Sequence, residues 1–277
     1  MGNSAASSEN HLLKYFQLRS NNFWFWFEKT FRDFGVEDLH KLRVEIKKFR
    51  SFLRYVEMDD KLAFDKKDHY RLLSTIFKPG GALRETQMNL ALLKRHRAFE
   101  LPGYQAYLTR RMEKQSVKLK ASLDQFDSDL MHELNELLLH ELSLINEAAI
   151  LSNASSFINS ELATMRKLRR VISNPKDLHQ VRTHTKAMGY VARMIYEMYP
   201  TKKLESLLLP AKSAEKLIGN WHDRVVFRNS LLRYLKKNPA TPEKDKIDRL
   251  LKQITYRNSV AVRHISMRLD GFINKRL

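Results

Sequence analysis

Residues 38–57 read DLHKLRVEIKKFRSFLRYVE and decide the fold of this chain. Their apolar side chains recur at alternating steps of three and four: Leu39, Leu42, Ile46, Phe49, Leu53 and Val56. This spacing predicts an α-helix with one apolar face packed against a core. The residue after each of the first five is basic: His40, Arg43, Lys47, Arg50 and Arg54. Since one residue turns a helix by ~100°, these five form a basic row beside the apolar face.

A similar pattern occurs in residues 177–196, DLHQVRTHTKAMGYVARMIY. Alignment of the two stretches pairs His40 with His179, Arg43 with Arg182, Lys47 with Lys186 and Arg54 with Arg193. A second pair of segments, residues 81–85 (GALRE) and 219–223 (GNWHD), follows the two basic helices in the same order. Two matches in the same order predict an internal duplication.

The composition indicates a folded helical protein with a large positive charge. Of the 277 residues 43% are hydrophobic, and only 8 Gly and 7 Pro argue against a loop-rich β architecture. The formal net charge is +19, which favours a polyanionic partner. Residues 121–165 contain no Lys or Arg but eight Asp or Glu, so the basic character belongs to the two similar units and an acidic middle segment separates them.

Several classes of protein are disfavoured. The absence of cysteine excludes disulfides and thiolate metal sites, and it suits a reducing cytoplasm. No stretch approaches the ~18 consecutive apolar residues of a membrane span. The opening residues lack a basic region followed by an apolar run, so they do not resemble a secretory signal. We therefore expect a cytoplasmic protein that does not span a membrane.

We expect four helices in each unit and no strands. The first unit comprises residues 1–153. Its expected helices span residues 10–33, the basic helix from residue 38, residues 65–97 and residues 104–151. We expect breaks in the third at Pro79-Gly80-Gly81 and in the fourth near residues 127–129. The expected helices of the second unit, residues 154–277, are residues 156–172, the second basic helix, a helix punctuated by Pro210 and Gly219 that continues over 221–237, and residues 243–274. Gly35 is expected to end the first helix, and Asp38 to cap the second.

Four motifs in this chain together carry a family likeness. They are His40-x-x-Arg43-x-x-x-Lys47-Lys48-x-Arg50, residues 81–85, Leu178-His179-x-x-Arg182-x-x-x-Lys186-x-x-x-Tyr190 and residues 217–223. In type and order they resemble the signatures of CHAD domains, the conserved histidine α-helical domains. The likeness covers nearly the whole chain.

The resemblance implies an all-α fold of two four-helix bundles related by a pseudo-twofold axis. The basic helices would face each other across a positively charged groove or pore that binds inorganic polyphosphate without catalysis. It also implies association with polyphosphate granules. The candidate polyphosphate-binding residues are His40, Arg43, Lys47, Lys48, Arg50, Arg54, Arg84, His179, Arg182, Lys186 and Arg193. Further cations expected to join the groove are Arg111, Lys114, Lys118 and Arg257.

The chain departs from the family's pattern in both units. Lys47 and Lys48 stand where Arg is usual, which keeps the charge but loses the bidentate contact. Glu85 replaces the usual Asp, and Gly189 stands where a basic residue would complete the second row. Because the second row is thinner, we expect the two halves to bind asymmetrically.

The two motif histidines suggest a pH-dependent contact. A single His at the start of a helix is commonly a local hydrogen-bonding group, whereas His40 and His179 at matched positions favour contact with phosphate. Protonation would add charge, so this pattern predicts stronger binding below pH ~6.5. Arg84, Glu85, His222 and Asp223 instead suggest a polar network between helices, in which carboxylates orient cations.

Three other interpretations remain open. The basic row could be the solvated face of a helix, although its duplication argues against this. The alternative function is nucleic-acid binding, since charge alone does not distinguish polyanions, but the first row lacks interleaved aromatic residues for stacking. A phosphatase would need metal ligands or an activated nucleophile. His222-Asp223 lacks further ligands, and His132 and His140 lack a carboxylate at ligand spacing, so we expect no metal, cofactor or enzymatic activity.

Overall fold

The computed structural model of the chain describes residues 10–62, 64–170 and 175–274. These ranges contain nine α-helices, a short 3₁₀ helix and no β-strand, which confirms the predicted all-α class. The helices of the first half are α1 (His11–Asp33), α2 (Val36–Val56), α3 (Lys67–Arg95), η1 (Arg97–Phe99), α4 (Pro102–Asp124) and α5 (Ser128–Ser143). Those of the second half are α6 (Glu147–Arg170), α7 (Pro175–Met198), α8 (Lys202–Lys237) and α9 (Lys244–Ile273). None of the described helices is long and apolar enough to cross a membrane.

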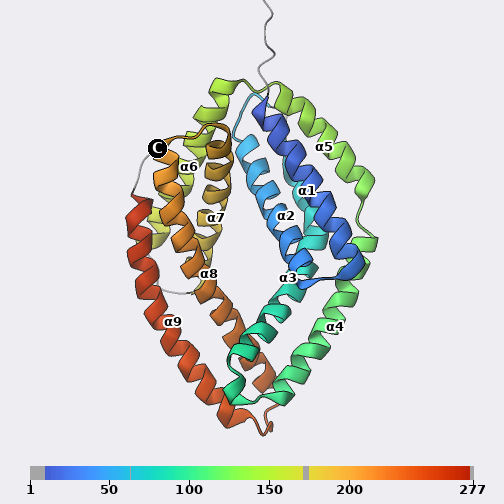
Figure 1. The fold of residues 1–277 in the computed structure, drawn as a ribbon, viewed down its shortest axis with the longest axis vertical. Coiled ribbons are helices and arrows are strands. Elements are labelled where there is room, and N and C mark those ends of the chain that lie inside the picture. Colours follow the sequence, from blue (N-terminus) through green and yellow to red (C-terminus); the bar gives the residue numbers. More distant parts are fainter. Residues whose placement is uncertain (1–9, 63, 171–174, 275–277) are drawn as a thin grey trace, which may run out of the picture.

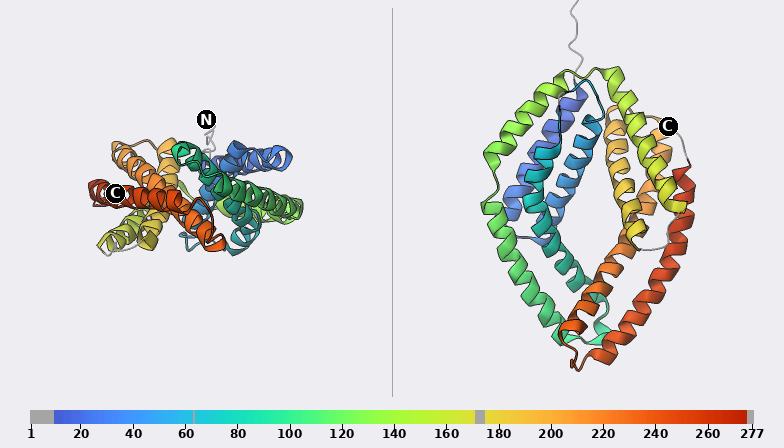
Figure 2. Two further views of the ribbon diagram at one scale, coloured as in Figure 1. Left: turned by 90° about the horizontal axis from the view of Figure 1, so that it is seen from below. Right: turned by 180° about the vertical axis from the view of Figure 1, so that it is seen from behind.

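The helices form two groups that stand side by side and are joined at both the upper and the lower end (Figures 1 and 2). α2 of the first group contacts α7 of the second, so the two basic helices lie beside each other in the middle of the molecule. The long helices α3 and α8 converge at the lower end, where they pack with α4 and α9. The acidic helix α5 covers the outer side of α1, away from α7. The proposed duplication stays a prediction, and the predicted boundary at residues 153–154 lies inside α6.

Apolar side chains form two separate buried cores. The larger core runs through both groups and contains the whole apolar face predicted from residues 38–57, whose six members are at most 1% exposed. The smaller core lies at the lower end and combines residues of α3 and α4 with Phe227 and Tyr234 of α8 and Ile247 of α9. Burial of a large apolar side chain contributes about 1.5–3 kcal/mol, so the apolar face holds the basic row of α2 firmly in place.

The break predicted at Pro79-Gly80-Gly81 does not occur, because α3 runs through it. Instead, the two glycines leave room for α2 to pack closely against α3. A Cβ at Gly80 would lie 3.1 Å from Leu39 Cδ1, and one at Gly81 would lie 3.0 Å from Arg43 Nη1. Similarly, α8 is continuous through Pro210 and Gly219, which were expected to punctuate it. Packing of both helices along their lengths outweighs the one backbone hydrogen bond that each proline removes.

Two predicted helix ends are wrong and one break is confirmed. Phe34, not Gly35, takes the left-handed conformation after α1, with φ 49° and its N–H bonded to Thr30 O. Gly35 then precedes α2, so Asp38 lies in the first turn rather than at the cap. The expected break near residues 127–129 separates α4 from α5, where the Asp127 carboxylate accepts the Leu130 N–H at 2.9 Å.

A single buried carboxylate joins the two halves at the lower end. Glu243, the residue before α9, accepts the N–H groups of Gly103 at 2.6 Å and Tyr104 at 3.0 Å in the first turn of α4. The carboxylate thus satisfies two N–H groups that have no partner within their own helix. Glu243 thereby holds the start of α9 against the start of α4, although the bonded residues lie 139 and 140 positions apart in sequence.

Glu243→Ala is expected to lower the free energy of unfolding by about 2–4 kcal/mol, because hydrogen bonds to charged groups are worth ~1.5–3 kcal/mol and the two N–H groups stay buried. Glu113→Ala on the exposed face of α4 is the matched control and should change it by less than about 0.5 kcal/mol. Urea denaturation monitored by circular dichroism measures both. Equal stabilities of the two variants would show that Glu243 does not fasten the lower end.

Candidate functional site: a cation-lined cavity between the basic helices

A cavity of about 830 Å³ lies between α2 and α7 and is also lined by residues of α3 and α8. We call it the central cavity. Seven of its lining residues are Lys or Arg: Arg43, Lys47, Arg50, Arg54, Arg84, Arg182 and Lys186. Three histidines and two carboxylates complete its charged or titratable lining apart from the tyrosines: His40, His179, His222, Glu85 and Asp223. The two basic rows predicted from sequence therefore meet at one cavity.

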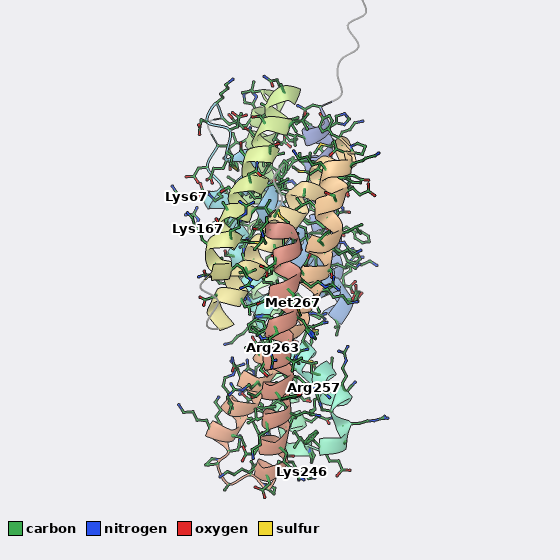
Figure 3. The ribbon with its side chains drawn as sticks, turned by 90° about the vertical axis from the view of Figure 1, so that its left-hand side faces the viewer. Lys67, Lys167, Lys246, Arg257, Arg263 and Met267 are labelled. Atoms are coloured by element: carbon green, nitrogen blue, oxygen red, sulfur yellow. The ribbon has the colours of Figure 1, made fainter. Side chains whose placement is uncertain are left out.

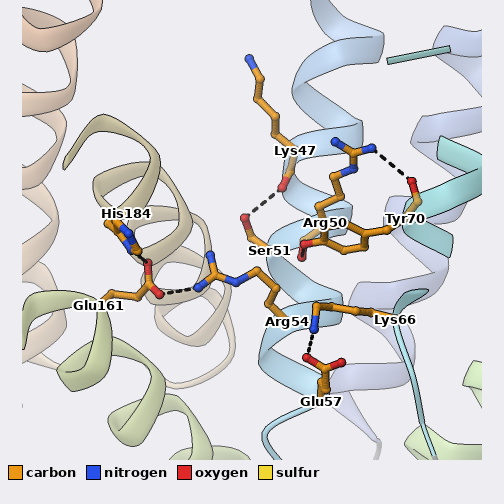
Figure 4. A network of polar contacts seen from close by, with 9 residues as sticks. All are labelled: Lys47, Arg50, Ser51, Arg54, Glu57, Lys66, Tyr70, Glu161 and His184. Atoms are coloured by element: carbon orange, nitrogen blue, oxygen red, sulfur yellow. Dashed lines mark hydrogen bonds and ion pairs between the residues drawn. The ribbon is translucent and has the colours of Figure 1, made fainter. Parts of the chain in front are cut away.

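Two arginines of α2 are braced against aromatic rings of α3. The Arg43 guanidinium lies 4.1 Å from the centre of the Phe77 ring and donates to the Phe77 carbonyl. The Arg50 guanidinium lies 4.5 Å from the Phe77 ring centre and 5.0 Å from that of Tyr70, and it donates to Ser74 Oγ at 2.8 Å. Figure 4 shows Arg50 reaching Tyr70. Because these contacts fix the side chains in advance, an anion that binds them loses little side-chain entropy.

Lys47 of α2 is surrounded by other cations in the cavity. It has no ion-pair partner among the residues that the structure describes, whereas Lys186 opposite it pairs with Glu215 at 2.8 Å. Burial, followed by the charges of Lys186, Arg43 and Arg182, lowers the pKa of Lys47 to about 7. The ammonium group is therefore only partly protonated at neutral pH in the free protein. A bound anion would reverse this balance by supplying the missing countercharge.

The arginines of the two halves repel each other across the cavity in the same way. Burial lowers the pKa of Arg43 to about 10, with further contributions from Arg50, Arg84 and Arg182. Arg84 comes from α3 and also has its pKa lowered, again first by burial. Like charges gathered around one cavity are unfavourable, so the lining carries an excess of positive charge.

The histidines lie together but are neutral at ordinary pH. The rings of His179 and His222 have their centres 5.0 Å apart. Burial lowers the pKa of His40 and His179, and it lowers that of His222 to about 4, assisted by Arg182 and His179. Each ring can donate one hydrogen bond to an oxyanion without carrying charge. Burial, assisted by the surrounding cations, therefore lowers the pH at which these histidines gain charge in the free protein below the expected ~6.5.

Carboxylates set the edges of the central cavity. Glu85 of α3 pairs with Arg233 of α8 at 2.7 Å, as expected of a polar network between helices. Burial raises the pKa of Asp223, while Arg182, Arg84 and Lys186 oppose that shift. At the other end, Arg54 reaches across to Glu161 of α6 at 2.5 Å, and His184 contacts the same carboxylate at 3.0 Å (Figure 4). Arg54 thus lines the cavity with its charge already partnered.

The family follows from comparison of the whole sequence. The family model described as "CHAD domain" matches residues 15–232, which is most of the chain. The chain belongs to the CHAD domain family. Among solved structures, the crystal structure of the CHAD domain from the plant Ricinus communis superposes with a TM-score of 0.79 at 16% identity, covering 96% of this chain and 91% of that one. A likeness at that identity shows a shared fold. The search of curated proteins found no match.

Nine of the fifteen predicted binding residues line the central cavity of this CHAD domain, and six do not. Lys48 points to Glu45, which also binds Arg19, and the two pairs are 2.7 and 2.9 Å long. Arg193 is exposed towards the end of α7. On α4, Arg111 donates to Tyr107 Oη at 3.3 Å, and Lys114 and Lys118 are exposed. Arg257 lines a different cavity.

Sequence reasoning missed the aromatic support of the CHAD site. Tyr70 and Phe77 line the central cavity beneath the arginines of α2, and Tyr190 of α7 lines it from the other side. Tyr190 closes the second motif, which was a usable signal. Nothing in the local pattern of α3 distinguishes Phe77 from an ordinary core residue. Among the described residues there is no group of three or more His, Asp or Glu side chains placed to hold a metal ion.

Proposed function

We propose that the central cavity binds inorganic polyphosphate and does not hydrolyse it. The observation that carries this proposal is the excess of cations: seven Lys and Arg side chains line the cavity beside two carboxylates. A linear array of oxyanions suits rows of Lys and Arg on successive turns of two helices, because charge-assisted N–H···O contacts to phosphate are strong. The family likeness noted from the motifs supports the same ligand, and binding to polyphosphate granules in the cell would follow from it.

The lining supports binding without chemistry. Its Ser and Thr hydroxyls are engaged within their own helices, because Ser51 donates to Lys47 O at 2.9 Å and Thr183 donates to His179 O at 3.1 Å. Neither hydroxyl is bonded to a general base, which an activated nucleophile would need. The role of the cavity in this proposal is to hold phosphate groups and to compensate their charge.

Nucleic acid is the alternative ligand and is less well supported. Binding of single strands relies on exposed aromatic faces on which bases stack. The aromatic rings of Tyr70 and Phe77 in this cavity are instead occupied by the guanidinium groups of Arg50 and Arg43. These two rings are therefore not free to stack with bases, which suits a polymer that has none.

Titration of the protein with long-chain polyphosphate and with single- and double-stranded DNA at the same physiological salt tests the proposal. We expect tight binding of polyphosphate, much weaker binding of DNA, and no release of orthophosphate over hours. Because affinities for polyanions fall with salt, both ligands are compared at several salt concentrations. DNA binding equal to or tighter than that of polyphosphate would refute the assignment of the ligand. Steady release of orthophosphate would show that the protein hydrolyses polyphosphate, and it would refute a role limited to binding.

A further inference from the structure

A second cavity, of about 460 Å³, lies where the end of α3 meets α8 and α9. We call it the lower cavity. Its lining includes three arginines from three different helices: Arg95 of α3, Arg224 of α8 and Arg257 of α9. His96, the residue after α3, also lines it, and its ring stacks on Phe227 with centres 6.0 Å apart. Asp223 is the one carboxylate in this lining.

The lower cavity adjoins the central cavity. Met88 of α3 and Asp223 of α8 line both, so the two spaces share a wall. Asp223 faces cations from each side, because the charges of Arg182, Arg84, Lys186 and Arg224 all act on its pKa. Its single negative charge is therefore shared among more cations than it can neutralise.

Two arginines of the lower cavity, Arg224 and Arg257, repel each other. Burial and then the charge of Arg257 lower the pKa of Arg224, and the same two causes lower that of His96. Arg224 is held in place because its Nε donates to Asn258 Oδ1 at 2.8 Å, which leaves its terminal nitrogens for other partners. Within the described ranges, none of the three arginines has an ion-pair partner. Figure 3 shows Arg257 on α9, between Arg263 and Lys246.

We propose that the lower cavity is a second phosphate-binding subsite, and that a polyphosphate chain held in the central cavity continues past Asp223 into it. The proposal rests on the function proposed above and extends it to the length of chain that the protein engages. The shared wall brings successive phosphates within reach of both sets of cations. The three arginines then contribute to the binding of long chains and not to that of short ones, since a short chain is bound entirely by the seven cations of the central cavity.

The test compares tripolyphosphate with long-chain polyphosphate in calorimetric titrations. The variant Arg224→Gln with Arg257→Gln removes two charges from the lower cavity, and Lys114→Gln with Lys118→Gln removes two from the exposed face of α4 as the control. We expect the lower-cavity variant to bind long chains at least about tenfold more weakly and tripolyphosphate within about twofold of the unmodified protein. The control should bind both within about twofold, and circular dichroism should show native helix content for both variants.

Unchanged affinity of the lower-cavity variant for long chains would overturn this inference and leave the central cavity untouched. Equal losses for both ligands would also overturn it, because the lower cavity would then not be selective for long chains. If the unmodified protein bound neither ligand, the proposed function itself would fail. The three results are distinguishable because the unmodified protein is titrated first.

Discussion

Replacing Lys47 and Arg182 together by glutamine is expected to weaken polyphosphate binding by about 10²- to 10⁴-fold, because each contact to a charged group is worth ~1.5–3 kcal/mol. These two residues line the central cavity from α2 and α7, and the charge of Arg182 already acts on the pKa of Lys47. Removing both leaves a gap in the middle of the two basic rows. Isothermal titration with long-chain polyphosphate measures the change.

The matched control, Lys114→Gln with Lys118→Gln, removes the same charge from an exposed surface. It should change the affinity by less than about twofold, since it changes only long-range attraction screened by salt. The sequence placed these two lysines in the groove, and the structure places them outside the lining of the central cavity. If the control weakened binding as much as the cavity variant, net charge rather than the cavity would account for the affinity.

The single variant Lys47→Gln should separate binding from folding. The folded protein lowers the pKa of Lys47 from its unfolded value of about 10.4 to about 7, so this residue costs folding free energy that grows as the pH falls from about 10 and is fully present below about pH 7. Loss of that charge is therefore expected to raise the melting temperature while it weakens binding. A variant that lost both binding and stability would show a packing role for Lys47 instead.

Polyphosphate affinity is expected to fall by about 50-fold between pH 7 and pH 9, because Lys47 must gain a proton when the anion binds. Its pKa of about 7 in the free protein means that protonated Lys47 becomes about tenfold rarer per pH unit above pH 7. Below pH 7 the dependence should flatten, since most Lys47 is then already charged. Titrations at constant ionic strength from pH 6 to pH 9 measure this curve.

Lys47→Arg is the control for the pH curve, because an arginine stays charged throughout this range. It should bind polyphosphate at pH 7 about as well as the unmodified protein and lose most of the dependence between pH 7 and pH 9. A curve that kept its slope in this variant would assign the proton to another group. The histidines contribute only at more acidic pH, because burial lowers the pKa of each of the three in the cavity.

Much of this arrangement follows from the spacing of residues 38–57. The apolar positions predicted the buried face of α2, and the basic residue after each turn predicted which side chains border the central cavity. Alignment with residues 177–196 then placed His179, Arg182 and Lys186 at the same site. The helical period of 3.6 residues is enough for these predictions, because it determines which side of a helix each side chain occupies.

The remaining errors concern contacts between helices, which local spacing does not encode. Lys48 was predicted to bind because it belongs to the first motif, yet it pairs with Glu45 and does not line the cavity. Arg54 lines the cavity as predicted, but its pairing with Glu161 could not be foreseen. Pro79 and the glycines after it were expected to break a helix, because their packing against α2 could not be foreseen. The depressed pKa of Lys47 likewise depends on Lys186 of the other half.

A crystal structure of the protein with long-chain polyphosphate tests the central claim most directly. We predict a continuous row of phosphate groups between α2 and α7, with oxygens within hydrogen-bond distance of the Lys47 ammonium and the Arg182 guanidinium. Phosphate density confined to the outer surface, for example along Lys114 and Lys118 of α4, with the central cavity empty of phosphate, would contradict it.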